Sequence, residues 1–451
     1  MKRKPSAMIV TIGVLLAASF AWSQWLETTV LFPDSLGRPQ CLAYNSTNNT
    51  IYVGWEDGDN VSVIDGATNE IIATVTAGGS HQSLCYNPTD NKVYCANRAS
   101  HDVTVIDGAT NQVLATLPTG NRPFALCYNI QSNKVYCANA SSDNVTVIDG
   151  ATDQVIAIIT AGDFPQAICY NPQGNKIYCA NSSSDNVTVI DGPANQVINE
   201  VPAGNGPRAL CYNPQGNKVY CANEDDTTMT VIDGAANELI TTVTVGNGPR
   251  ALCHNPANNK VYCANEDGNS VTVINGVTDE VITTVTVGEE PRALCHNPAN
   301  NKVYCANRVS NTVTVIDGAT DSVVALVTVG REPRSMVWSP AQNRMYVANY
   351  FASNVSVIVD VTGIAEVLPG VAGGQEPGAT FVRGMLNLDA SQNPVFPGES
   401  GSRHGPVLVD GAGKRVAVLH VGANDIRHLA PGIYFIVPES GREVGKVVVT
   451  R

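Results

Sequence analysis

Residues 249–288 read PRALCHNPANNKVYCANEDGNSVTVINGVTDEVITTVTVG, and this stretch decides the fold. Val, Ile, Thr and Tyr fill four short runs, which are Ala251–His254, Lys260–Ala264, Val271–Ile274 and Val281–Val287. Asn, Pro, Asp and Gly fill the gaps between them, as turns between strands require. None of the runs is long enough, or has the 3.6-residue period, to be a helix. The stretch therefore predicts four short β-strands.

The same pattern recurs along the chain. Its central tyrosine returns every 42 residues without an insertion, at Tyr52, Tyr94, Tyr136, Tyr178, Tyr220, Tyr262, Tyr304 and Tyr346. Four strands in a unit of this length are typical of a β-propeller blade. Eight copies predict an all-β protein whose main domain is an eight-bladed β-propeller.

The repeated strings Tyr94-Cys95-Ala96-Asn97, Tyr346-Val347-Ala348-Asn349 and Val103–Gly108 resemble the YVTN family of β-propeller repeats. The resemblance covers about residues 28–360. It implies a propeller of the kind found in surface-layer and other exported proteins, usually without catalysis. Seven blades are common in that family, so a seven-bladed ring is the alternative.

The two ends of the array indicate how the ring closes. Leu26-Glu27-Thr28-Thr29-Val30 precedes the first copy and looks like a fourth strand without its first three, whereas the eighth copy has three strands within Ser335–Ile358. An open ring would leave two unpaired sheet edges. We therefore expect the N-terminal strand to pair with blade eight. Ile364–Leu368 is the rival for that place.

The N-terminal residues read as a secretory signal peptide. A basic start, Lys2-Arg3-Lys4, is followed by an apolar run, Ala7–Ala21, and by the small-x-small site Ala21-Trp22-Ser23. The mature chain is then predicted to begin at Gln24. No later segment has eighteen consecutive apolar residues, so no membrane span is predicted after cleavage.

Beyond the repeat, the composition changes. We assign residues 1–23 to the signal, 24–365 to the propeller, 366–380 to a linker and 381–451 to a small C-terminal β-sandwich. Leu429–Phe435 and Lys446–Arg451 resemble the C-terminal sorting domain of type IX secretion substrates, which implies export across a bacterial outer membrane. An immunoglobulin-like accessory domain without a sorting role is the alternative.

Twelve of the thirteen cysteines occupy two positions ten residues apart in copies two to seven. The pairs are Cys85 and Cys95, Cys127 and Cys137, Cys169 and Cys179, Cys211 and Cys221, Cys253 and Cys263, and Cys295 and Cys305. With the hairpin turn centred near Asp90, residues 85 and 95 would oppose each other within disulfide range. We therefore expect six disulfides within blades. The alternative is that these cysteines are small buried apolar residues.

One position per copy is a candidate binding residue, because it should lie near the mouth of the central channel. There the copies read Gln40, Gln82, Phe124, Gln166, Arg208, Arg250, Arg292 and Arg334. Four guanidinium groups on adjacent blades could bind a carboxylate, sulfate or phosphate. The alternative is that the arginines pair with nearby acids, namely Glu224, Glu266, Glu289 and Glu290.

No catalytic, cofactor or metal motif is visible. The sequence has no Ser-His-Asp or Cys-His pattern, no H-E-x-x-H string and no Gly-rich phosphate loop. His254 and His296 occupy a position that is Tyr in five other copies and Trp338 in the eighth, so they read as aromatic strand residues. A net charge of −13 repels nucleic acid and anionic membranes.

These features predict an exported protein, secreted or at the cell surface, that is not an enzyme. It would act as a monomeric binding or structural scaffold for a protein or a glycan, without a cofactor. Two alternatives stay open. One is a propeller enzyme, either lactonase-like or quinone-dependent, and the other is a periplasmic binder of an anion or a metal.

Overall fold

The computed structural model describes residues 24–33 and 36–360, and then seven strands between residues 379 and 449. The predicted signal peptide lies outside the described residues, as does residue range 361–378. The chain divides into two compact units, and the boundary in the sequence falls between Ile364 and Ala365. None of the helices in the described ranges is long and apolar enough to cross a bilayer.

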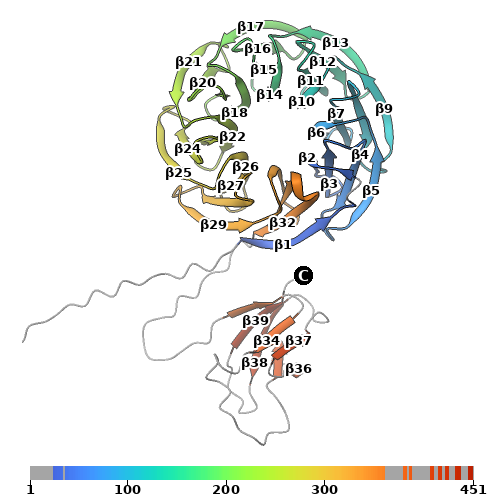
Figure 1. The fold of residues 1–451 in the computed structure, drawn as a ribbon, viewed down its shortest axis with the longest axis vertical. Coiled ribbons are helices and arrows are strands. Elements are labelled where there is room, and N and C mark those ends of the chain that lie inside the picture. The colour runs from blue at the N-terminus through green and yellow to red at the C-terminus, as the bar shows by residue number, and fades with distance from the viewer. Residues whose placement is uncertain are drawn as a thin grey trace, which may run out of the picture. The chain divides into compact units, whose positions relative to one another are not determined.

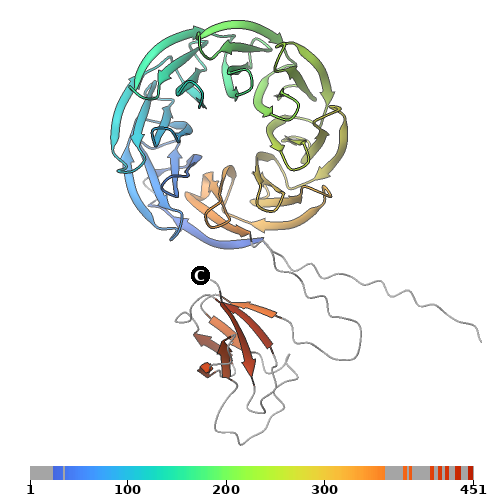
Figure 2. The same cartoon turned by 180° about the vertical axis from the view of Figure 1, so that it is seen from behind.

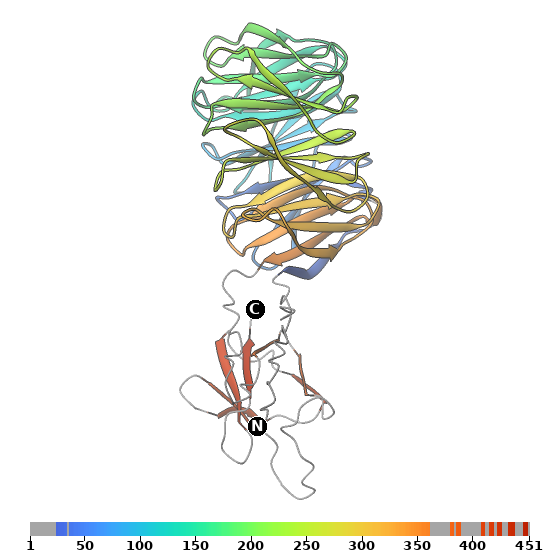
Figure 3. The same ribbon diagram turned by 90° about the vertical axis from the view of Figure 1, so that its left-hand side faces the viewer.

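The first unit is an eight-bladed β-propeller, as predicted, so the seven-bladed alternative is wrong. Each blade is one antiparallel sheet of four strands. Figures 1 and 2 show the eight sheets in chain order around the ring, and Figure 3 shows the ring edge-on. Contact between the innermost strands of the eighth and first blades completes the circle.

Each blade is built outward from the centre of the ring. The innermost strands are β2 (Pro39–Asn45), β6 (His81–Asn87), β10 (Pro123–Asn129), β14 (Pro165–Asn171), β18 (Pro207–Asn213), β22 (Pro249–Asn255), β26 (Pro291–Asn297) and β30 (Pro333–Ser339). The second strands are β3 (Thr50–Trp55), β7 (Lys92–Asn97), β11 (Lys134–Asn139), β15 (Lys176–Asn181), β19 (Lys218–Asn223), β23 (Lys260–Asn265), β27 (Lys302–Asn307) and β31 (Arg344–Asn349).

The outer half of each blade follows the same order. The third strands are β4 (Asn60–Asp65), β8 (Asp102–Asp107), β12 (Asn144–Asp149), β16 (Asn186–Asp191), β20 (Thr228–Asp233), β24 (Ser270–Asn275), β28 (Thr312–Asp317) and β32 (Asn354–Asp360). The outermost strands are β5 (Ile71–Thr76), β9 (Val113–Pro118), β13 (Gln154–Thr160), β17 (Gln196–Pro202), β21 (Leu239–Thr244), β25 (Val281–Thr286), β29 (Val323–Thr328) and β1 (Gln24–Leu31).

The N-terminal strand closes the ring, as predicted. β1 pairs antiparallel with β32, so the eighth sheet has the order β1-β32-β31-β30. Glu27 is the extra residue of a bulge in β1, and Arg344 of β31 reaches its carboxylate through two contacts of 2.6 and 2.7 Å. Arg344 also donates to the carbonyl oxygen of Gly66 in blade one, at 2.6 Å. One buried side chain therefore ties the first and last blades to the N-terminal strand.

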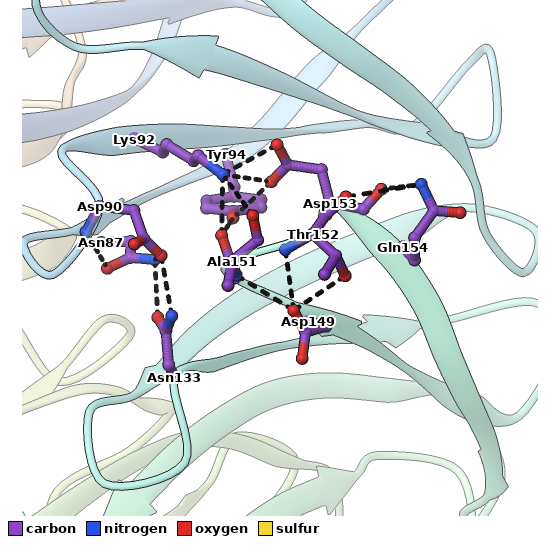
Figure 4. Close-up of polar contacts among 11 residues, drawn as sticks. Asn87, Asp90, Lys92, Tyr94, Asn133, Asp149, Ala151, Thr152, Asp153 and Gln154 are labelled. Atoms are coloured by element: carbon purple, nitrogen blue, oxygen red, sulfur yellow. Dashed lines mark hydrogen bonds and ion pairs between the residues drawn. The ribbon is translucent and has the colours of Figure 1, made fainter.

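The core lies between the blades. In one interface Tyr94 and Val105 of blade two pack against Val135 and Ile148 of blade three, all fully buried. Polar contacts cross the same interface (Figure 4): Lys92 Nζ donates to the carbonyl oxygen of Gly150 at 2.8 Å. This arrangement explains why the Lys-x-Tyr pattern recurs, since each repeat buries its apolar face only against its neighbour.

The predicted disulfides are absent, because all thirteen cysteines are free. In blade two Cys85 pairs with Tyr94, and Cys95 pairs with Leu84, so the two cysteines lie on neighbouring rungs and point to opposite faces of the sheet. The other five pairs have the same register. Burial raises the pKa of Cys85 to about 12, which keeps its thiol protonated.

The second unit contains strands alone among its described residues. They are β33 (Ala379–Val382), β34 (Met385–Leu388), β35 (Val407–Asp410), β36 (Arg415–Val418), β37 (Gly422–Asp425), β38 (Gly432–Val437) and β39 (Gly445–Val449). Five form a sheet of order β33-β39-β38-β35-β36, and β34 pairs with β37. The β-sandwich and its sorting role stay predictions.

Candidate functional site

The four predicted arginines each occupy a β-bulge at the start of an innermost strand. In blade eight Pro333 pairs with Asn349 and Ser335 pairs with Ala348, so Arg334 is the extra residue between them. The same shift occurs at this position in the other seven blades. Bulges re-aim a side chain out of its sheet and are frequent beside functional sites. The repeat therefore places one bulged residue per blade on an innermost strand, and Figure 1 shows these strands around the centre of the ring.

Glutamates at the ends of the second strands interleave with these arginines. Glu224 contacts Arg208 at 3.5 Å and also pairs with Arg250. Glu266 lies 2.7 Å from Arg250 Nη1 and 3.2 Å from Arg292 Nη1. The predicted pairing with Glu224 and Glu266 is thus present. Of the other two acids named from the sequence, Glu290 pairs with Arg308, whereas Glu289 is exposed.

The chain of charges continues through blade eight into blade one. Glu332 Oε2 lies 3.3 Å from Arg334 Nη2 and 3.9 Å from Arg308 Nη1. Arg334 stacks over the ring of Tyr350, 3.2 Å from its centroid, and the Tyr350 hydroxyl donates to Glu56. We call the whole set the charged arc. It consists of Arg208, Glu224, Arg250, Glu266, Arg292, Arg308, Glu332, Arg334 and Glu56.

The guanidinium groups of the charged arc keep some hydrogen-bond donors that the surrounding glutamates do not use. The side chains of Arg208, Arg250, Arg292 and Arg334 are only 13–21% exposed. Burial and the like charge of Arg250 lower the pKa of Arg292 to about 10. Among the described residues, the buried Nε atoms of Arg308 and Arg334 have no hydrogen-bond acceptor. Buried donors in this state favour a bound anion.

A second position, just before the first strand, holds the backbone in the left-handed region. Blades five and six use glycine there, Gly206 with φ of 65° and Gly248 with φ of 64°. Blade eight instead places Glu332 there, with φ of 53°. A non-glycine residue in this region costs roughly 1 kcal/mol, and such strain clusters at functional sites. Ser80, Arg122, Phe164 and Glu290 share this conformation, so it belongs to the repeat, and in blade eight it places the carboxylate of Glu332 beside Arg334.

The opposite side of the ring is nearly free of acids at these positions and carries two phenylalanines. Phe124 of blade three lies 5.3 Å from the guanidinium carbon of Arg208. Phe164 of blade four stacks with Arg122 at 5.5 Å. In blade four Gln166 Nε2 donates to Ser182 Oγ at 2.6 Å. We call Phe124 and Phe164 the aromatic shelf.

The sequence identified one of three variable positions in each repeat. The arginines were found because they stand directly before the first predicted strand of each copy. Glu332, Phe164 and Arg308 were missed, although each also changes between otherwise constant copies. A comparison of every position across the eight copies would have found them. In the described part of the chain, no group of three or more His, Cys, Asp or Glu side chains is arranged to hold a metal.

Comparison with known proteins adds the family likeness. Residues 235–362 match the model of the family described as "Lactonase, 7-bladed beta-propeller", although this ring has eight blades. The match spans the blades that carry Arg250, Arg292 and Arg334. None of the curated proteins compared with the chain matches it.

Two solved structures share the fold. Hydrazine synthase of Kuenenia stuttgartiensis is 22% identical, with a TM-score of 0.52 over 62% of this chain and 96% of its own. Dihydro-heme d1 dehydrogenase NirN in complex with DHE is 14% identical, with a TM-score of 0.62 over 75% and 76%. At these identities the likeness establishes the propeller fold alone. The lactonase match, in contrast, contradicts the expectation that this protein is not an enzyme, and the chain is a β-propeller repeat protein that resembles an enzyme family.

Proposed function

We propose that the propeller is an enzyme that hydrolyses a small lactone or ester carrying an acidic group, bound at the charged arc. The observation that carries the proposal is the presence of buried guanidinium donors that make no hydrogen bond within the described part of the chain. Arg292 has a lowered pKa, and the Nε atoms of Arg308 and Arg334 have no acceptor among the described residues. The lactonase match supports the reaction class, because it covers the same three blades.

The arginines supply binding and charge stabilisation. A substrate carboxylate would accept hydrogen bonds from guanidinium groups, which bind such groups through paired donors. Attack on the substrate carbonyl places negative charge on its oxygen, and a buried donor aimed at that oxygen stabilises the tetrahedral intermediate. Arg334 Nε makes no hydrogen bond among the described residues, and Arg308 Nε lies 3.7 Å from Glu266 Oε1, beyond hydrogen-bond range, so these two donors are the groups available for this task.

Glu332 is our candidate for the general base. Both of its guanidinium contacts use Oε2, so Oε1 is available to accept a proton from water. The water oxygen then bonds to the carbonyl carbon. Collapse of the intermediate breaks the ring C–O bond, and the proton passes to the released alkoxide to give a hydroxy acid. No cofactor enters this step.

The test is hydrolysis of a carboxylate-bearing lactone, followed by pH-stat, with purified wild type and variants. Glu332→Gln should lower kcat by about 100-fold or more without raising KM, because the base is lost while the guanidinium groups of Arg308 and Arg334 remain. Glu289→Gln removes the same charge from an exposed turn and should behave as wild type. If E332Q had the same kcat as wild type, and both proteins hydrolysed the lactone faster than the uncatalysed background, Glu332 would be excluded as the base.

Arginine variants test the binding role separately. Arg292→Gln should raise KM, and Arg331→Gln, an exposed arginine three residues from Arg334, should leave it unchanged. An equal effect of R292Q and R331Q would mean that the charged arc acts only through its overall field.

A further inference from the structure

The aromatic shelf lies across the ring from the middle of the charged arc. The innermost strands contact one another in chain order, β2 to β6 and onward to β30 and back to β2. In a ring of eight, blades three and four therefore stand opposite blades seven and eight. Phe124 and Phe164 belong to the first pair of blades, and Arg292 and Arg334 belong to the second.

At the positions of Phe124 and Phe164, the other copies of the repeat have polar residues or glycine. At the bulge position the eight copies have four arginines, three glutamines and Phe124. Arg208 reaches past blade four to stack on that ring, which shows that Phe124 projects toward the centre of the ring rather than into a blade interface. A guanidinium stacked on one ring presents its other flat face to a further planar group.

Phe164 adds an independent observation, because its backbone is strained. Its φ of 57° is left-handed, where blades five and six have glycine, and a bulky residue in that region is a genuine outlier. The repeat enforces this conformation: the Phe164 N–H donates to Asp143 Oδ1 at 2.9 Å, and its carbonyl accepts from Ser182 N at 3.1 Å. Ser80, Arg122, Glu290 and Glu332 share the conformation in other blades, so what distinguishes blade four is the half-buried aromatic ring that Phe164 carries at this strained position.

We infer that the aromatic shelf is a second subsite of the same site and takes a planar, conjugated ring. The inference rests on the proposed function and names its substrate class. The substrate is a planar-ring acid, held by its acidic group at the Arg208 end of the charged arc, 5.3 Å from Phe124, and by the face of its ring at the aromatic shelf and the guanidinium groups stacked on it. Planar rings are favoured over saturated ones because stacking requires a flat face.

The test is calorimetric titration of the full chain with benzoate and with cyclohexanecarboxylate, which match in charge and carbon count but differ in planarity. Wild type should bind benzoate about threefold to tenfold more tightly. Phe124→Gln, the residue of the flanking copies, and Phe164→Gly, the residue of blades five and six, should abolish this preference and leave cyclohexanecarboxylate binding unchanged. The melting temperature of F164G should equal or exceed that of wild type, because glycine relieves the strain.

The outcomes separate the two proposals. Equal binding of both acids by wild type, or a preference that survives in F124Q and F164G, would overturn the aromatic subsite and leave the charged arc as the acid site. A fall in the melting temperature of F164G would overturn the strain argument for Phe164. Failure of wild type to bind either acid would overturn the proposed function together with this inference.

Discussion

Replacing Arg344 should open the ring at its seam. In copies two to seven the equivalent residue is lysine, for example Lys134, which donates to the carbonyl oxygens of Gly192 and Pro193 in the next blade. Arg344 makes the matching contacts to Gly66 and Ala67 and adds a two-pronged contact with Glu27 of β1. The two side chains are only 6% and 4% exposed.

The magnitude follows from this burial. Arg344→Met removes the guanidinium that faces a buried carboxylate, and breaking a buried pair in this way destabilises by about 3–5 kcal/mol. Arg344→Lys keeps the charge and the contacts to blade one but loses the two-pronged contact with Glu27. We therefore expect the free energy of unfolding to fall by about 2 kcal/mol. Lys260→Met is the matched control, since it breaks a lysine–aspartate pair within the array, away from the seam.

The assay combines urea unfolding with hydrogen exchange of the β1 amides. R344M should accelerate exchange in β1 selectively, whereas K260M should leave β1 protected, because blade six does not hold the N-terminal strand. Loss of less than about 1 kcal/mol in R344M, or equal β1 exchange in both variants, would refute the idea that Arg344 locks the closure.

Three further predictions concern the thiols, acid stability and export. All thirteen cysteines should resist a thiol reagent in the native protein and react after unfolding, because burial raises their pKa values; reaction of several native thiols at neutral pH would contradict this. His81 is neutral, with a pKa lowered to about 4 by burial, and its Nδ1 accepts the Trp55 N–H at 2.9 Å. Its contribution to stability should be complete above pH 6.5 and be lost as pH falls to about 4, at most about 3 kcal/mol, and urea unfolding at pH 7 and 4.5 should show a smaller loss in H81Q than in wild type. We propose that the chain is exported, so N-terminal sequencing of protein recovered from its host should begin at Gln24; a chain that retains residues 1–23 would contradict this.

The sequence predicts the fold well because each blade is a local unit repeated at constant spacing. The 42-residue step of the tyrosines and the orphan strand before the first copy were enough to predict eight blades and N-terminal closure. The disulfide prediction was wrong because it placed the centre of the hairpin half a residue too far along the chain. Four residues, 88–91, connect the paired Asn87 and Lys92, so the hairpin is centred between Thr89 and Asp90 rather than on Asp90. A slip of one register position moves a side chain to the other face of the sheet.

The site was only partly predictable for a different reason. A charged side chain at a constant position, such as Arg292, stands out in the sequence. Its effect depends on which acids from other blades reach it, and Glu266 directly follows the second strand of the neighbouring blade. The residue types of Glu332 and Phe164 do not predict their left-handed conformation. In the sequence only Gly206 and Gly248, at the equivalent positions of two other copies, indicate it. The expectation of a non-catalytic protein rested on missing known motifs, and a site spread over several blades contains no short motif to find.

The most direct test of the account is the charge preference of the reaction. Wild-type kcat/KM would be measured by pH-stat on a lactone that bears a free carboxylate and on the methyl ester of the same carboxylate. The account predicts at least about tenfold faster hydrolysis of the lactone ring in the acid, since one charge-assisted hydrogen bond to the charged arc contributes that much, and loss of the preference in R292Q. Absence of ring hydrolysis for either compound, or equal rates that R292Q leaves unchanged, would contradict it.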